Sequence, residues 1–173
     1  MLDLLGLALL RLPDTLARCL PSLTALHCNT NSLECLPECV GELRLLQTLV
    51  ARYNVLESLP DTLGGLASLT TLDLGHNHLH ALPDSIGSVP TLVTLDLNSN
   101  AIEVLPATIT RLSTLRTLDV HSNRLTGLPE RIGETSAARS AIDVHAQREA
   151  PKPRHRMWLW LSLLGAWLSL IGA

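Results

Sequence analysis

The stretch LTTLDLGHNHLHALPDSIGSVPT, residues 69–91, decides the fold, because the chain repeats its pattern in register every 23 residues. Residues 92–114 read LVTLDLNSNAIEVLPATITRLST, and residues 115–133 begin another copy with LRTLDVHSNRLTGLPERIG. Earlier copies start at Leu23 and Leu46, so five rows share one template. Self-similarity at a fixed period of roughly 20–50 residues indicates a repeat architecture, in which each copy forms one structural unit.

Each column of the template has a physical reason. The fourth and sixth positions of a row are apolar and their neighbours are mostly polar, which predicts a short, half-buried strand. Those two columns hold Leu26, Leu49, Leu72, Leu95 and Leu118, and Cys28, Ala51, Leu74, Leu97 and Val120. A Leu-Pro pair follows in every row, and we expect it to start the return limb, because proline cannot donate a ladder hydrogen bond.

The ninth position of every row is asparagine. An Asn side chain both donates to and accepts from backbone groups, so stacked copies would satisfy the backbone where the chain leaves the strand. We therefore predict a structural ladder of Asn31, Asn54, Asn77, Asn100 and Asn123.

This pattern resembles the leucine-rich-repeat family, and its LP..IG.L return limb is similar to the 23-residue intracellular subclass that includes Ras-associated scaffold and suppressor proteins. The resemblance covers residues 23 to about 133. It implies an α/β solenoid with a short parallel sheet on the concave face and short helical or 3₁₀ segments on the convex face. It also implies a non-catalytic adaptor or scaffold, expected as a monomer, that binds another protein such as a small GTPase or signalling complex.

The template decays at both ends. Residues 1–22 read as a degenerate N-terminal repeat in which Leu7 replaces the asparagine, and 23–137 hold the five repeats. Residues 138–156 read as a degenerate sixth repeat followed by a basic, proline-containing linker. Neither end has a recognisable polar cap, which stacked repeats need for solubility. The chain is therefore either a truncated or fragmentary repeat protein without independent activity, or a protein whose ends a partner covers.

Residues 157–173, MWLWLSLLGAWLSLIGA, carry no charge and follow the basic stretch PKPRHR. As a helix they would span about 25 Å, against a hydrocarbon core of about 30 Å. Three interpretations stay open: a tail anchor that ties cytoplasmic repeats to an intracellular membrane, a helix that folds back on the last repeat, or an aberrant C-terminus without function.

The concave positions of the rows are where we expect a partner to bind. Asp73, Asp96 and Asp119 share the fifth column, about 4.8 Å apart on neighbouring strands, so this carboxylate row is either well solvated or open to a cation or basic partner. Hydrogen bonds made locally by these aspartates are the alternative. Arg52 and Tyr53 are residue types that dominate binding hot spots. The full predicted patch is Asp73, Asp96, Asp119, Arg52, Tyr53, His76, Asn98 and His121.

Composition narrows the function further. Residues 23–137 contain 12 acidic and 6 basic residues, which argues against nucleic acid, because phosphate binding needs a concentrated basic face. All four cysteines lie in the first quarter of the chain, which indicates reduced thiols and a cytoplasmic location.

Catalytic and metal chemistry find little support. A zinc site from His27, Cys28, Cys35 and Cys39 has no familiar ligand spacing, so buried or semi-buried thiols are the favoured interpretation. The alternating His76, His78 and His80 could in principle bind zinc or copper, but His78 and His80 flank a core leucine and are expected to face solvent. No glycine-rich phosphate loop and no nucleophile placed with a base is recognisable. We therefore predict no enzyme, no catalytic residue, no metal and no cofactor.

Overall fold

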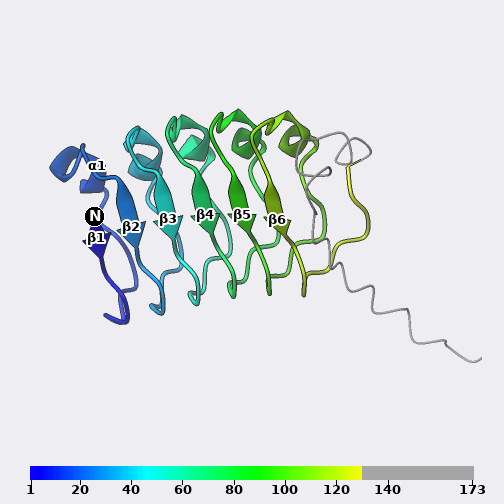
Figure 1. Ribbon diagram of the computed structural model, residues 1–173. Coiled ribbons are helices and arrows are strands. Elements are labelled where there is room, and N and C mark those ends of the chain that lie inside the picture. The colour runs from blue at the N-terminus through cyan, green and yellow to red at the C-terminus, as the bar shows by residue number, and fades with distance from the viewer. Residues whose placement is uncertain (130–173) are drawn as a thin grey trace, which may run out of the picture.

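The computed structural model describes residues 1–129 and folds them into a solenoid, which confirms the predicted leucine-rich-repeat architecture (Figure 1). The degenerate sixth repeat and the segment 157–173 lie outside the described residues. Within residues 1–129, six short strands form one parallel sheet in chain order. The strands are β1 (Leu2–Asp3), β2 (Ala25–His27), β3 (Thr48–Val50), β4 (Thr71–Asp73), β5 (Thr94–Asp96) and β6 (Thr117–Asp119).

The sheet keeps the register of the sequence repeat. Leu49 pairs with Leu72 and Leu72 with Leu95, one row apart each time. The middle residue of each strand from β2 to β6 is buried, while its neighbours are at least partly exposed on the opposite face. The alternation therefore puts leucine in the core and leaves the third and fifth columns of each row on the concave surface.

The return limbs contain short helices on the other side of the core, along one edge of the ribbon in Figure 1. Four are 3₁₀ helices that follow the Leu-Pro pairs, and the first limb holds a single α-helical turn. They are η1 (Glu38–Glu42), η2 (Asp61–Gly65), η3 (Asp84–Ser88), η4 (Ala107–Arg111) and α1 (Leu16–Cys19). The proline carbonyl accepts the first hydrogen bond of each 3₁₀ turn, as in Leu63 N–H to Pro60 O at 3.2 Å. Proline thus starts the limb as an acceptor, where its missing N–H costs nothing.

The asparagine of each row bridges that row to the row before it. The Asn77 Oδ1 atom accepts from the Leu56 N–H at 3.1 Å, and Nδ2 donates to the carbonyls of Ala51 and Leu74 at 3.1 and 2.9 Å. Asn54, Asn100 and Asn123 repeat this pattern. Asn31 accepts from the Leu7 and Leu9 N–H groups and donates to the Leu4 carbonyl. Every one of these bonds satisfies backbone that has left the strand and has no ladder partner there.

The residue before each asparagine turns the chain out of the sheet. It has a positive φ of 53–55° in all five turns, and none of the five is glycine. The residues are Thr30, Tyr53, His76, Ser99 and Ser122, whereas in the first row, which has no asparagine, Gly6 and Ala8 have positive φ. A side chain in this left-handed region costs roughly 1 kcal/mol, so the bonds of the neighbouring asparagine must hold the turn in place.

Glycine lets the 3₁₀ helices of neighbouring rows approach backbone to backbone. A Cβ added at Gly87 would lie 2.3 Å from the Thr108 carbonyl oxygen, and one at Gly41 would lie 2.0 Å from the Thr62 carbonyl oxygen. Real Cβ atoms do not approach backbone oxygens so closely. Glycine in this column therefore sets the spacing between the return limbs.

We predict that Gly87→Ala lowers the free energy of unfolding by about 1–3 kcal/mol, because η3 and η4 must move apart to relieve the clash. Gly127→Ala is the matched control, since nothing lies within 4 Å of a Cβ built there. Urea unfolding of the two variants beside the parent chain makes the comparison. Equal transition midpoints for both variants would contradict the close packing described here.

Candidate binding face

Three aspartates stand in register on the concave surface. Asp73 pairs with Asp96 and Asp96 with Asp119 on neighbouring strands. One carboxylate oxygen of each is bound locally, because Oδ1 accepts from the backbone N–H two residues later: Gly75 at 3.0 Å, Asn98 at 2.9 Å and His121 at 3.0 Å. The local hydrogen bonds considered from the sequence are therefore present, and they leave Oδ2 of each aspartate for other partners.

Arg52 reaches across a whole row to this column. Its Nη1 atom lies 3.1 Å from Asp96 Oδ2 and 3.9 Å from Asp73 Oδ2. The guanidinium can pass because the intervening row has glycine in the seventh position. A Cβ on Gly75 would lie 3.2 Å from Nη1 and 2.8 Å from Asn98 Nδ2. The sequence placed Arg52 beside the carboxylate row as a partner anchor and missed its internal ion pair, although Gly75 in the same column is the feature that permits it.

An aromatic pair adjoins the ion pair at the end of the strands. The rings of Tyr53 and His76 stack with centroids 4.3 Å apart and planes 16° apart. The Arg52 Cζ atom lies 5.2 Å from the centre of the Tyr53 ring, within the range of a cation–π contact. Tyr53 is still 50% exposed. Neighbouring rows thus combine a half-exposed aromatic surface with a fixed cation.

Asn98 and His121 extend the group toward β6. Asn98 is only 2% exposed; its Nδ2 donates to Asp96 Oδ1, and its Oδ1 has no partner among the described residues. His121 Nδ1 lies 2.6 Å from Asp119 Oδ1. The eight residues predicted for the partner patch therefore lie along consecutive rows of one face, and we call them the concave cluster: Arg52, Tyr53, Asp73, His76, Asp96, Asn98, Asp119 and His121.

The charges of the concave cluster are coupled. Burial raises the pKa of the Asp73 carboxyl above its ordinary value; the Asp96 carboxylate adds to the rise, while the Gly75 N–H and the Arg52 guanidinium oppose it. Burial acts to lower the pKa of Arg52, but Tyr53 and the two carboxylates outweigh it, so that pKa lies above its ordinary value. Arg52 therefore stays charged and offsets part of the repulsion within the row.

The other residues considered for chemistry lie apart from the concave cluster. Burial raises the pKa of the Cys28 thiol to about 12, so it is a core residue and not a thiolate ligand. His78 and His80 are exposed, whereas His76 packs on Tyr53. Across residues 1–129, no group of three or more His, Cys, Asp or Glu side chains could hold a metal ion. Likewise, none of the helices described is long and apolar enough to cross a membrane.

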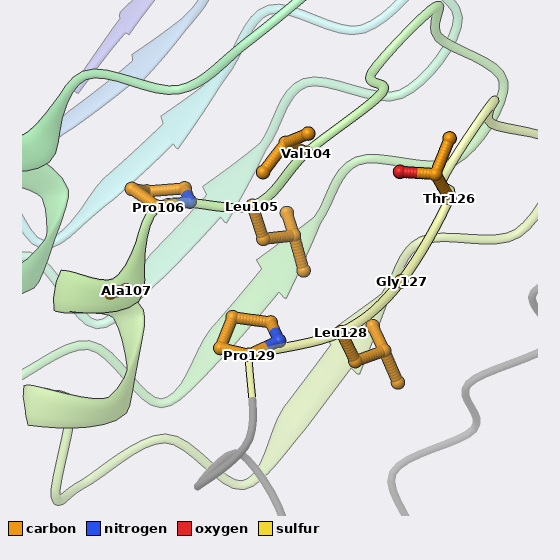
Figure 2. A pocket seen from close by; sticks show the side chains of 8 residues that line it. All are labelled: Val104, Leu105, Pro106, Ala107, Thr126, Gly127, Leu128 and Pro129. Atoms are coloured by element: carbon orange, nitrogen blue, oxygen red, sulfur yellow. The ribbon is translucent and has the colours of Figure 1, made fainter.

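An apolar hollow of about 440 Å³ lies beside the Leu-Pro corners of the fourth and fifth rows. Figure 2 shows Pro106 and Pro129 in equivalent places on two neighbouring limbs, with Leu105 and Leu128 next to them. Its lining consists of Val104, Leu105, Pro106, Ala107, Thr126, Gly127, Leu128 and Pro129. None of these side chains is titratable, so the hollow offers apolar surface and no chemistry.

We predict a coupling of about 1 kcal/mol between Arg52 and Asp96 in a double-mutant cycle of Arg52→Met and Asp96→Asn, measured by urea unfolding at low salt. The pair is partly buried, so the coupling should fall only in part at about 1 M salt. A second cycle on Arg11 and Glu34 is the control, because that 3.6 Å pair is mostly exposed and should couple by about 0.2 kcal/mol or less. Equal coupling energies in the two cycles would contradict the partly buried ion pair between Arg52 and Asp96.

Comparison with known proteins agrees with this architecture. The family model for the leucine rich repeat matches residues 67–125. A leucine-rich-repeat protein of Leptospira interrogans is 34% identical, with a TM-score of 0.71, over 74% of this chain and 32% of that one. The plant peptide hormone receptor RGFR1, solved in complex with RGF2, is 30% identical, with a TM-score of 0.60, over 65% of this chain and 19% of the receptor.

A third similar structure is the ectodomain of the plant membrane receptor kinase GASSHO1/SCHENGEN3 from Arabidopsis thaliana, in complex with CASPARIAN STRIP INTEGRITY FACTOR 2. It is 31% identical, with a TM-score of 0.62, over 66% of this chain and 14% of that one. The chain thus spans about a third of the bacterial protein and less than a fifth of each receptor. No curated protein matches it. The family match, the shared architecture and the repeating rows together identify residues 1–129 as a leucine-rich-repeat solenoid.

Proposed function

We propose that the chain is a non-catalytic interaction module that binds a protein or peptide partner on the concave cluster. The observation that carries this proposal is the continuity of the cluster: Arg52, the Tyr53–His76 stack and the aspartate column lie on consecutive rows of one sheet. Arginine and tyrosine are the residue types that most often dominate binding energy, and here both are held in place before a partner arrives.

The rigidity of the scaffold supports the proposal. Strands β2 to β6 keep the same register, and the asparagine ladder fixes the turns that carry Tyr53 and His76. A partner therefore loses little binding free energy to ordering this surface. The similar structures support the class of partner, because two of them are plant receptors solved in complex with RGF2 and with CASPARIAN STRIP INTEGRITY FACTOR 2.

The finer part of the proposal comes from the resemblance to intracellular repeat proteins. It assigns the chain to the cytoplasm and its partner to signalling proteins, such as a small GTPase or a signalling complex. Should residues 157–173 act as a tail anchor, the same face would work beside an intracellular membrane.

Site-specific photo-crosslinking in cells tests the proposal. We predict that a photoreactive phenylalanine analogue at position 53 captures a discrete partner, whereas the same analogue at position 45 does not. Tyr53 and Leu45 are equally exposed, at 50% and 52%, but Leu45 lies on the return limb between η1 and β3, away from the concave cluster. Mass spectrometry identifies the adducts. Capture of the same partner from position 45 with equal yield, or no adduct from position 53, would refute the concave face as the binding surface.

A further inference from the structure

We infer that the partner contributes an arginine side chain, which binds over His76 and pairs with Asp96 and Asp119. This inference rests on the proposed function and specifies the chemistry of the partner: an extended peptide segment that carries at least one arginine. Three observations lead to it, namely the internal precedent of Arg52, the offset of the repeat and a surplus of hydrogen-bond acceptors.

Arg52 already shows how this surface holds a guanidinium. The group lies over the Tyr53 ring, 5.2 Å from its centre, and its Nη1 atom bonds Asp96 Oδ2 at 3.1 Å and approaches Asp73 Oδ2 at 3.9 Å. One position therefore combines a ring from one row with carboxylates from the next two rows. Guanidinium suits this combination because it is planar, stacks on rings and donates to carboxylates in its own plane.

The repeat offers the same arrangement again, one row further on. A shift of 23 residues carries Tyr53 to His76, Asp73 to Asp96 and Asp96 to Asp119, and each pair of aspartates is in register. The same shift carries Arg52 to Gly75, which has no side chain, and Gly75 to Asn98, whose buried amide lines the position. A ring and two carboxylates thus recur, and of the two carboxylates only Asp96 is already paired with an arginine from residues 1–129. The partner's arginine would take the role that Arg52 plays in the row before.

The column that follows His76 leaves room for such a group. After Tyr53 and His76, the eighth column continues with Ser99 and Ser122, whose side chains are small. Tyr53 stacks on His76 from the second row, so the other face of the imidazole ring is directed toward Ser99 in the fourth row. Neighbouring strands are about 4.8 Å apart, close to a stacking distance, so a planar group above Ser99 continues the stack.

Hydrogen-bond acceptors outnumber donors at this position. Asn98 Oδ1 is buried and has no donor among residues 1–129, and the Asn98 amide is directed at the carboxylate row, because its Nδ2 bonds Asp96. Asp119 Oδ1 is bonded by His121, while its Oδ2 receives no hydrogen bond from the described part of the chain. Guanidinium brings five N–H donors and no acceptor, whereas an ammonium group is a point charge that does not stack.

Selection from a phage-displayed library of random dodecapeptides on the full chain tests the inference. We expect the enriched peptides to share an arginine, and replacement of that arginine by lysine in the synthetic peptide to weaken binding about tenfold. On the protein, His76→Ser and Asp119→Asn should each weaken binding of the same peptide by a similar factor. Asp61→Asn on the convex helix η2 is the matched control and should leave binding unchanged.

The outcomes separate the inference from the proposed function. Enriched peptides without arginine, whose binding is lost in Tyr53→Ala, would overturn the arginine and keep the concave face as the binding surface. Arginine peptides whose binding is unaffected by both His76→Ser and Asp119→Asn would overturn this position for the guanidinium. A library that yields no binder to the full chain would count against the inference and against peptide binding by the concave cluster together.

Discussion

The structure depends on one repeated interaction, the bridge that an asparagine side chain makes between the backbones of two rows. Where the chain leaves the sheet, its N–H and C=O groups lose their ladder partners inside an apolar stack, and leaving them unpaired would cost about 1–3 kcal/mol each. Each asparagine accepts from the row before and donates to the carbonyls of both rows. The turns can then hold non-glycine residues at positive φ. Leucine burial supplies the driving force, but the asparagines determine where each row turns.

The binding face follows from that constraint. Because each row is fixed to the next, side chains 23 residues apart meet across the sheet, and contacts such as the Tyr53–His76 stack form between rows. A single residue that departs from its neighbours in a column can then change the contacts made on this surface. Gly75 allows Arg52 to cross the third row and bond Asp96, whereas a larger residue there would confine the guanidinium to its own row. The repeat fixes where side chains stand on the sheet, and the positions at which one row differs from the next determine which contacts they make.

Much of this was predictable from the sequence. The strand columns, the Leu-Pro return limbs and the aspartate register all follow from a period of 23 residues and the alternation of a strand. Leu7 interrupts the asparagine column in the first row, yet Asn31 of the second row bonds the backbone of residues 4–9, so the first row loses only the bonds that an asparagine donates within its own row. The Arg52–Asp96 ion pair was not predicted, because it joins the second and fourth rows and depends on the shape of the third. The repeat pattern describes one row at a time, so it cannot predict a contact between side chains two rows apart.

The free energy of unfolding of Asn77→Ala in the full chain tests the central claim most directly. Loss of this side chain leaves the buried Leu56 N–H without an acceptor and removes one of the donors to the Ala51 and Leu74 carbonyls. We predict a loss of about 2–4 kcal/mol by urea unfolding. The comparison is Asn29→Ala, because the Asn29 Oδ1 atom is buried without a partner among residues 1–129 and should be removed at little cost. If Asn77→Ala destabilises the chain no more than Asn29→Ala does, the asparagine ladder does not hold the rows together.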